Sequence, residues 1–428
     1  YARREDWTGR DSATRAIANR IVEDATVKPS LLRPLPLKQN AGIAWVCSLL
    51  NERYLDNDAR MALADNINYG LLAALGDRVD VHTRITLIET LRSTIIQNDQ
   101  LNKGTVTRLR TELILGGLRL SSGDADGARQ ALTAAYELAD KLHTDDPANI
   151  DCTAYYVTAC RKLTNYALLT DQALLARRYS RLASDTAASA YRSHPDSAVC
   201  LGLHCGADLD FAQVCLLQPD YKSAEAYYQQ AYRLIKESDE AAVGKAWQQM
   251  MFMESGAGLA SLRARQGRLS EAVRLGEFAM DSAMARYLQD PADAQYRFDL
   301  ARQRIAYGSL LLQNQDLENS KTCILSGVVD CERFIKKVAD SAVYLRALAE
   351  GYYWAARLYG ALADGPVTAL YQKQFETFFS RLTDTGMPAN EPLQNMLADI
   401  RSHPELFQPP QPAAPADPPP LAAASSST

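Results

Sequence analysis

The sequence lacks the motifs on which most catalytic and membrane assignments depend. Its eight cysteines form no Cys-x-x-Cys pair, and its five histidines are scattered singly along the chain. A Gly-rich phosphate loop, His-Arg-Asp and Asp-Phe-Gly are all absent, so this chain holds no kinase catalytic core. No apolar run approaches about 18 residues, the length needed to cross a bilayer. We therefore predict no enzyme activity, no metal, no cofactor and no membrane insertion for this chain.

The sequence also lacks an excess of positive charge. Its 46 Lys and Arg are outnumbered by 51 Asp and Glu, which gives a formal net charge of −5 over the whole length. A nucleic-acid-binding protein usually presents a basic patch or stripe, so we expect no nucleic-acid partner. The hydrophobic content of 47% and the charged content of 23% are those of a soluble globular protein.

What the sequence does contain is a pattern of small residues that recurs every 48 residues. A small residue recurs at this interval at the start of a predicted second helix, as Ala128, Ala176, Ala224, Ala272 and Ser320. Twelve residues earlier the chain has Gly116, Thr164, Ala212, Ala260 and Gly308, and seven residues later it has Ala135, Ala183, Ala231, Ala279 and Gly327. A fixed period of this size indicates a repeat array.

Small residues at three fixed places predict two antiparallel helices that cross too closely for larger side chains. Turn formers such as Gly123-Asp124 and Gly267-Arg268 separate the two helices of a pair. This design resembles tetratricopeptide-repeat proteins over residues 58–384, although the period is longer than the family's usual 34 residues. The fold class that follows is all-α, a right-handed α-solenoid of helix hairpins.

Four regions are expected along the chain. Residues 1–57 form a helical lead-in, residues 58–384 hold about seven helix hairpins, residues 385–408 contain a capping helix, and residues 409–428 form a disordered tail rich in Pro, Ala and Ser. Several turns between hairpins carry a proline, which ends a helix cleanly.

A closer resemblance rests on the junctions between repeats. Residues 290–301 read Asp-Pro-Ala-Asp-Ala-Gln-Tyr-Arg-Phe-Asp-Leu-Ala, and residues 146–149 repeat the same junction. This segment is similar to the repeats that follow the membrane span in many bacterial serine/threonine protein kinases. The resemblance implies a kinase upstream of Tyr1, and a regulatory role for this chain outside the cytoplasm. A free-standing scaffold would instead be cytoplasmic, so the compartment stays open.

One cluster on a single predicted helix has the residue types of a metal site. Cys200, His204, Cys205 and Asp208 lie within three turns, but zinc requires four converging ligands at a recognisable spacing. A packed helix is therefore the favoured interpretation. Cys152 and Cys200 fall one period apart, which generally is too far for a disulfide, so buried thiols are expected.

The groove of the solenoid is the predicted binding surface, because the first helix of each pair lines the concave side. Arg161, Lys162 and Asn165 lie on one such helix and resemble the cationic and amide pair with which chaperone-binding tetratricopeptide domains hold a terminal carboxylate. The equivalent places on the next helix hold Leu209, Asp210 and Gln213, so a solvated helix face remains the alternative. The other groove candidates are Tyr155, Tyr156, Arg302 and Tyr353.

Two functions follow from these observations. The first is a non-catalytic scaffold that binds a protein or peptide segment in its groove. The alternative is the regulatory region of a membrane kinase.

Overall fold

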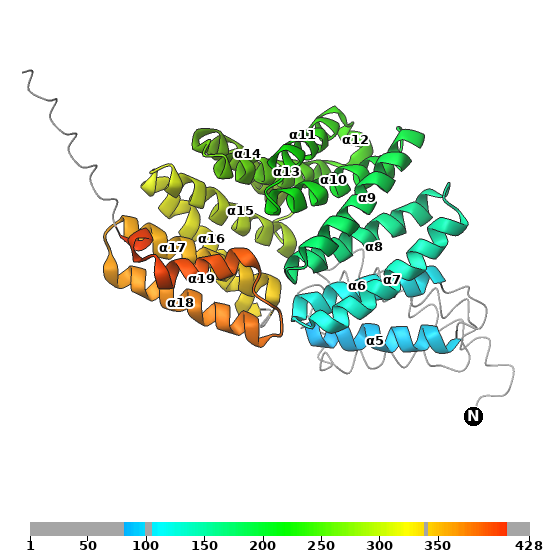
Figure 1. The fold of residues 1–428 in the computed structure, drawn as a ribbon, viewed down its shortest axis with the longest axis horizontal. Helices are drawn as coiled ribbons and strands as arrows, with labels where there is room; N and C mark the ends of the chain where they lie inside the picture. Colours follow the sequence, from blue (N-terminus) through cyan, green and yellow to red (C-terminus); the bar gives the residue numbers. More distant parts are fainter. Residues whose placement is uncertain (1–80, 99–104, 338–340, 409–428) are drawn as a thin grey trace, which may run out of the picture.

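The computed structural model describes residues 81–98, 105–337 and 341–408, and within them every regular element is a helix (Figure 1). The prediction of an all-helical solenoid is confirmed. Six complete hairpins follow one another in the described residues. Their first helices are α6 (Thr105–Ser122), α8 (Ile150–Leu169), α10 (Ala198–Leu217), α13 (Lys245–Arg265), α15 (Ala294–Gln313) and α17 (Ala342–Ala361). Their second helices are α7 (Ala125–Asp145), α9 (Ala173–Ser193), α11 (Tyr221–Glu237), α14 (Leu269–Gln289), α16 (Leu317–Lys337) and α18 (Gly365–Asp384).

Four further elements complete the described chain. They are α5 (Val81–Asn98) before the first complete hairpin, the short α12 (Glu240–Val243), α19 (Glu391–Ser402) and the 3₁₀ turn η5 (Pro404–Phe407). The predicted lead-in, the first half of the first hairpin and the predicted tail lie outside the described residues.

The turn inside each hairpin is built in the same way. The residue two positions before the second helix has a left-handed backbone at Gly123 (φ 90°), Asp171 (58°), Gly267 (74°), Gln315 (65°) and Ala363 (61°), and Pro219 has φ 28°. The next backbone N–H then bonds to the carbonyl five residues earlier, as from Asp316 to Leu311 at 2.9 Å. This pattern is a Schellman ending. It repeats at 48-residue intervals, so every hairpin turns with the same geometry.

The helices of a hairpin cross as closely as the small residues predict. Ala128, Ala176, Ala224, Ala272 and Ser320 are all fully buried. A Cβ added to Gly308 would lie 2.6 Å from Ile324 Cγ1 and 3.0 Å from its backbone nitrogen. The Ser320 hydroxyl bridges the same crossing, since it donates to the Gly308 carbonyl at 2.8 Å. The small residues therefore set the distance between the two helices.

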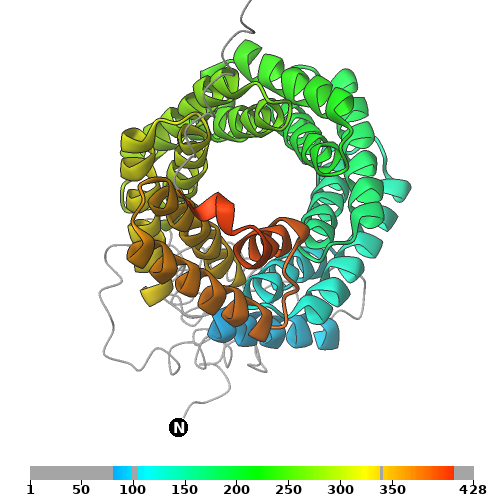
Figure 2. The ribbon, with the colours of Figure 1, turned by 60° about the vertical axis from the view of Figure 1, so that its left-hand side comes forward.

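The solenoid curls until its two described ends meet. Figure 2 shows a closed ring, with the first helices inside and the second helices outside. At the seam α6 contacts α17, and a Cβ on Gly123 would lie 2.5 Å from the Thr385 carbonyl oxygen. One buried apolar cluster runs across the seam, because it contains Leu120 and Leu132 as well as Met387 and Leu393.

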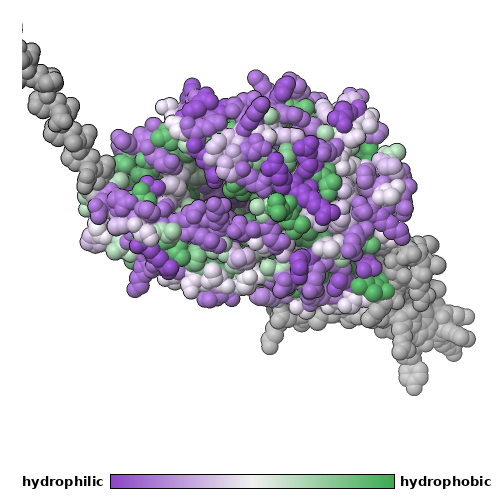
Figure 3. All heavy atoms as spheres, in the orientation of Figure 1, coloured by the Kyte–Doolittle hydropathy of each residue, from purple (hydrophilic) through white to green (hydrophobic). Residues whose placement is uncertain are grey.

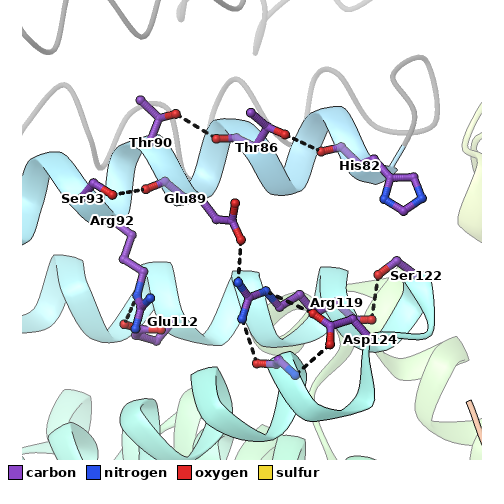
Figure 4. A network of polar contacts seen from close by, with 11 residues as sticks. His82, Thr86, Glu89, Thr90, Arg92, Ser93, Glu112, Arg119, Ser122 and Asp124 are labelled. Carbon is purple, nitrogen blue, oxygen red and sulfur yellow. Dashed lines mark hydrogen bonds and ion pairs between the residues drawn. The ribbon is translucent and has the colours of Figure 1, made fainter. Parts of the chain in front are cut away.

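Ion pairs tie α5 to the first complete hairpin (Figure 4). Arg92 on α5 pairs with Glu112 on α6 at 2.6 Å, and the Glu112 side chain is fully buried. Arg119 on α6 reaches Glu89 on α5 and also bonds to the Gly127 carbonyl on α7 at 3.2 Å. A buried carboxylate is tolerated only when paired, so α5 belongs to the folded array.

One described helix, α10, is long and apolar enough to cross a membrane by length and composition, with a mean hydropathy of 1.3. The sequence analysis found no apolar run of this length, because His204, Asp208, Asp210 and Gln213 interrupt the stretch. The leucines and cysteines of α10 raise its mean hydropathy enough to offset its two aspartates. In the structure 72% of this stretch is buried, and α10 packs against α8, α9, α11 and α13. It is a core helix of the solenoid.

The close crossings generate a stability prediction. A Cβ on Gly327 would lie 2.7 Å from the Ala301 carbonyl oxygen and 3.2 Å from the Ile305 backbone nitrogen, both on the partner helix α15. We expect Gly327→Ala to lower the free energy of unfolding by about 1 to 3 kcal/mol, because backbone must move. Gly117 is the matched control, since a Cβ there meets nothing within 4 Å. Gly117→Ala should add about 0.5 to 1 kcal/mol by raising helix propensity. Urea denaturation measures both, and shifts of the same sign would contradict the packing.

Candidate binding lumen

The inner faces of the first helices enclose a lumen. Figure 2 shows the first helices arranged around the ring axis, and Figure 3, in the orientation of Figure 1, shows a recess in the surface that both hydrophilic and hydrophobic residues border. The segment α19 and η5 lies inside the ring beside α17. It is fastened by the Tyr353 hydroxyl, which donates to Asp399 at 2.6 Å, and by Phe407, whose backbone lies against Gly360.

Charged side chains of alternating sign occupy one level of this lumen. Glu254, Arg302 and Glu350 stand 48 residues apart on α13, α15 and α17, so they share one position of the repeat. Each is exposed or half-buried, and none makes a hydrogen bond or ion pair with another described residue. Three successive inner helices thus present a negative, a positive and a negative charge to the lumen.

A fourth charge reaches the same level from α8. The equivalent place on α10 is Gly206, and a Cβ there would lie 2.6 Å from Nη1 of Arg161. The Arg161 guanidinium therefore lies across the bare backbone of Gly206. Its Nε also donates to Asp210 at 2.6 Å. We call Arg161, Glu254, Arg302 and Glu350 the charge ladder, which reads plus, minus, plus, minus around the wall.

The walls of the lumen disfavour these charges. The surrounding protein raises the pKa of Glu254 to about 7 by desolvation, although Arg161 and Arg302 lower that pKa. Burial likewise raises the pKa of Glu350 and lowers the pKa of Arg346, one turn away on α17. Charges that are partly desolvated and not directly paired gain when a ligand supplies opposite charge.

The structure separates the predicted groove residues into three groups. Lys162 and Asn165 on α8 and Arg302 on α15 are exposed on inner helices, and Arg161 on α8 is half-buried. Tyr155 is half-buried and accepts a hydrogen bond from Arg110. Tyr353 is 3% exposed because α19 and η5 cover it.

The seventh candidate, Tyr156, is buried and stacks on His143 with ring centroids 5.1 Å apart. The sequence analysis missed Glu254, Arg346 and Glu350. The 48-residue spacing of Glu254, Arg302 and Glu350 was the signal that could have found them.

One contact changes the predicted cation and amide set that would hold a partner's terminal carboxylate. Because Arg161 Nε donates to Asp210, only the terminal Nη groups of its guanidinium, beside Gly206, are left for a ligand carboxylate. Lys162 and Asn165 make no hydrogen bond or ion pair with another described residue.

The cysteine and histidine cluster on α10 is part of the core. Cys200 and Cys205 are buried free thiols, and burial raises the pKa of Cys205 to about 12. His204 Nδ1 lies 3.6 Å from Asp208 Oδ2, and the Ser184 hydroxyl donates to Asp208 Oδ1 at 2.8 Å. In the part of the chain that the structure describes, no three potential ligands converge as a metal site would require.

No protein-family model matches this chain, and no curated protein matches its sequence. Solved structures with a similar fold include the hypoxic regulator of sterol synthesis Nro1, described as a nuclear import adaptor. It is 12% identical with a TM-score of 0.37, covering 74% of this chain and 98% of Nro1. A human IFIT1 dimer with PPP-AAAA is 14% identical with a TM-score of 0.40, covering 89% of this chain and 80% of that one.

These likenesses are too distant to assign a family or a partner. The fold therefore rests on the structure itself, and the predicted relation to kinase-associated repeats stays a prediction.

Asp208 generates a prediction on pH. Burial raises its pKa from 3.8 to about 7, against the hydrogen bond from Ser184, and Asp185 adds to the rise. Between these values the folded state holds a proton that the unfolded chain has lost, so this carboxyl makes stability fall as pH rises from about 4 to about 7. Asp208→Asn removes the titration and keeps an acceptor for Ser184.

The difference in the free energy of unfolding between Asp208→Asn and the original chain should shift by a few kcal/mol in favour of the variant when the pH rises from 4 to 8. Urea titrations at both pH values measure this difference. Asp281→Asn, an exposed site on α14, is the control and should show no such gain. Parallel pH profiles for Asp208→Asn and the original chain would contradict the assignment.

Proposed function

We propose that this protein is a non-catalytic scaffold of the tetratricopeptide type, and that its lumen binds a segment of a partner protein. The observation that carries the proposal is the set Glu254, Arg302 and Glu350, three charged side chains at one repeat position on the inner helices. None of them makes a hydrogen bond or ion pair with another described residue, and Arg302 lies over the ring of Phe298. Side chains on an outer surface are solvated by water at little cost. Charges partly desolvated in a lumen are costly, and a bound segment with complementary charge offsets that cost.

The side chains of the lumen carry charges of both signs, which supports a protein partner over a nucleic acid. Asp210, Glu254 and Glu350 line the same wall as Arg161 and Arg302. A phosphate backbone requires clustered cations that release counterions, and these three carboxylates would repel it. A polypeptide carries both signs and can match such a wall.

The proposal predicts that substitutions in the lumen weaken binding while substitutions outside do not. Arg302 is the better lead than Arg161, because removing Arg161 also leaves Asp210 without its partner. Once a partner is isolated, Arg302→Ala should weaken its binding about tenfold or more, since a charged hydrogen bond is worth roughly 1.5 to 3 kcal/mol. Titration calorimetry measures the change.

Arg233 on the outer helix α11 is the matched control, because it is exposed and makes no hydrogen bond or ion pair with a described residue. Arg233→Ala should leave the affinity unchanged, and both variants should unfold at the same temperature as the original chain. Equal losses from Arg302→Ala and Arg233→Ala would place the interaction outside the lumen.

A further inference from the structure

The order of charges in the ladder specifies the partner more closely. Building on the proposed function, we infer that the bound segment is an extended polypeptide in the polyproline II conformation, which runs around the lumen wall and carries charges of alternating sign at every third residue. Acidic side chains would lie at Arg161 and Arg302, and basic side chains at Glu254 and Glu350.

The spacing follows from helix packing. Successive inner helices contact one another along the array, as α8 with α10 and α13 with α15. Packed helices have axes about 8 to 10 Å apart. A polyproline II chain advances about 3.1 Å per residue with about three residues per turn, so every third side chain points to the same side. One step of the ladder therefore corresponds to about three residues of extended chain.

An extended segment fits the wall better than a helix does. From α8 to α17 the inner wall curves around much of the ring (Figure 2). A straight helix would touch a concave wall only near its ends, and α19 already takes up part of the interior. An extended chain can follow the curve and reach all four charges of the ladder.

The alternation itself selects against uniformly charged partners. A wholly acidic segment would match Arg161 and Arg302 but would meet Glu254 and Glu350, where like charges repel. A wholly basic segment would fail at Arg161 and Arg302 for the same reason. Only a segment that alternates in the same order satisfies every step of the ladder.

The test uses synthetic fluorescent peptides with the full chain. One carries Glu, Lys, Glu and Lys at every third position with Ser and Gly between, and a second has the reverse order, because the wall does not fix the chain direction. A block peptide of identical composition, with Glu, Glu, Lys and Lys in that order, is the matched control. Fluorescence anisotropy at pH 8, above the pKa of Glu254, should show one alternating peptide binding at least tenfold more tightly than the block peptide.

A charge exchange then assigns the contact. Arg302→Glu should weaken the alternating peptide about tenfold or more, and a peptide with Lys in place of the facing Glu should regain most of that loss. Equal binding of block and alternating peptides, or no recovery on exchange, would overturn the inference.

The two proposals can fail separately. If no alternating peptide is preferred while the natural partner still loses affinity with Arg302→Ala, the charge order is wrong and the lumen remains the binding site. If the natural partner is also insensitive to Arg302→Ala, both proposals fall.

Discussion

The close crossing of two helices at small residues is the constraint on which the rest of this structure depends. Where Gly308 meets Ile324 and Ser320, Gly308 leaves no room for a side chain of its own, and the equivalent crossings are buried in every repeat of the series. Nearly identical hairpins stack with nearly identical rotations, and such rotations add up along a solenoid. Six hairpins bring the Gly123 turn back against Thr385, which closes the ring.

Because the ring is closed, residues at the same repeat position on successive first helices surround one enclosed space. Every first helix faces inward, so a residue chosen at one position of the period appears at one level of the lumen on each helix. Glu254, Arg302 and Glu350 are an example, and Gly206 admits the Arg161 guanidinium to the same level. The enclosing walls also raise the pKa of Glu254 to about 7 through desolvation. On an open solenoid surface water would solvate such charges. In a closed ring they are partly desolvated, so a ligand of opposite charge stabilises them.

The sequence predicted the hairpins well because their determinants are local. Ala128, Ala224 and Ser320 mark the crossings, and Gly123 and Gly267 mark turns that require a left-handed backbone. Ring closure was not predictable, since it depends on the sum of small rotations that no single residue encodes. The lumen was predicted only in part. Arg302 was predicted to lie in the groove and is exposed on the inner helix α15, but helical periodicity cannot tell inward charges such as Glu350 from outward ones such as Arg233. Tyr353 was expected to line the groove, and the docking of α19 over it is a long-range contact that leaves no local pattern.

The central claim is that a partner segment occupies the lumen, and site-specific photo-crosslinking tests it most directly. A photoreactive amino acid placed at Ala306, exposed on α15 one turn after Arg302, should crosslink to the bound partner. The same group at Arg233 on the outer wall should not. Crosslinks from position 306 alone are the result that this account predicts. Crosslinks from position 233, with none from position 306, would contradict it.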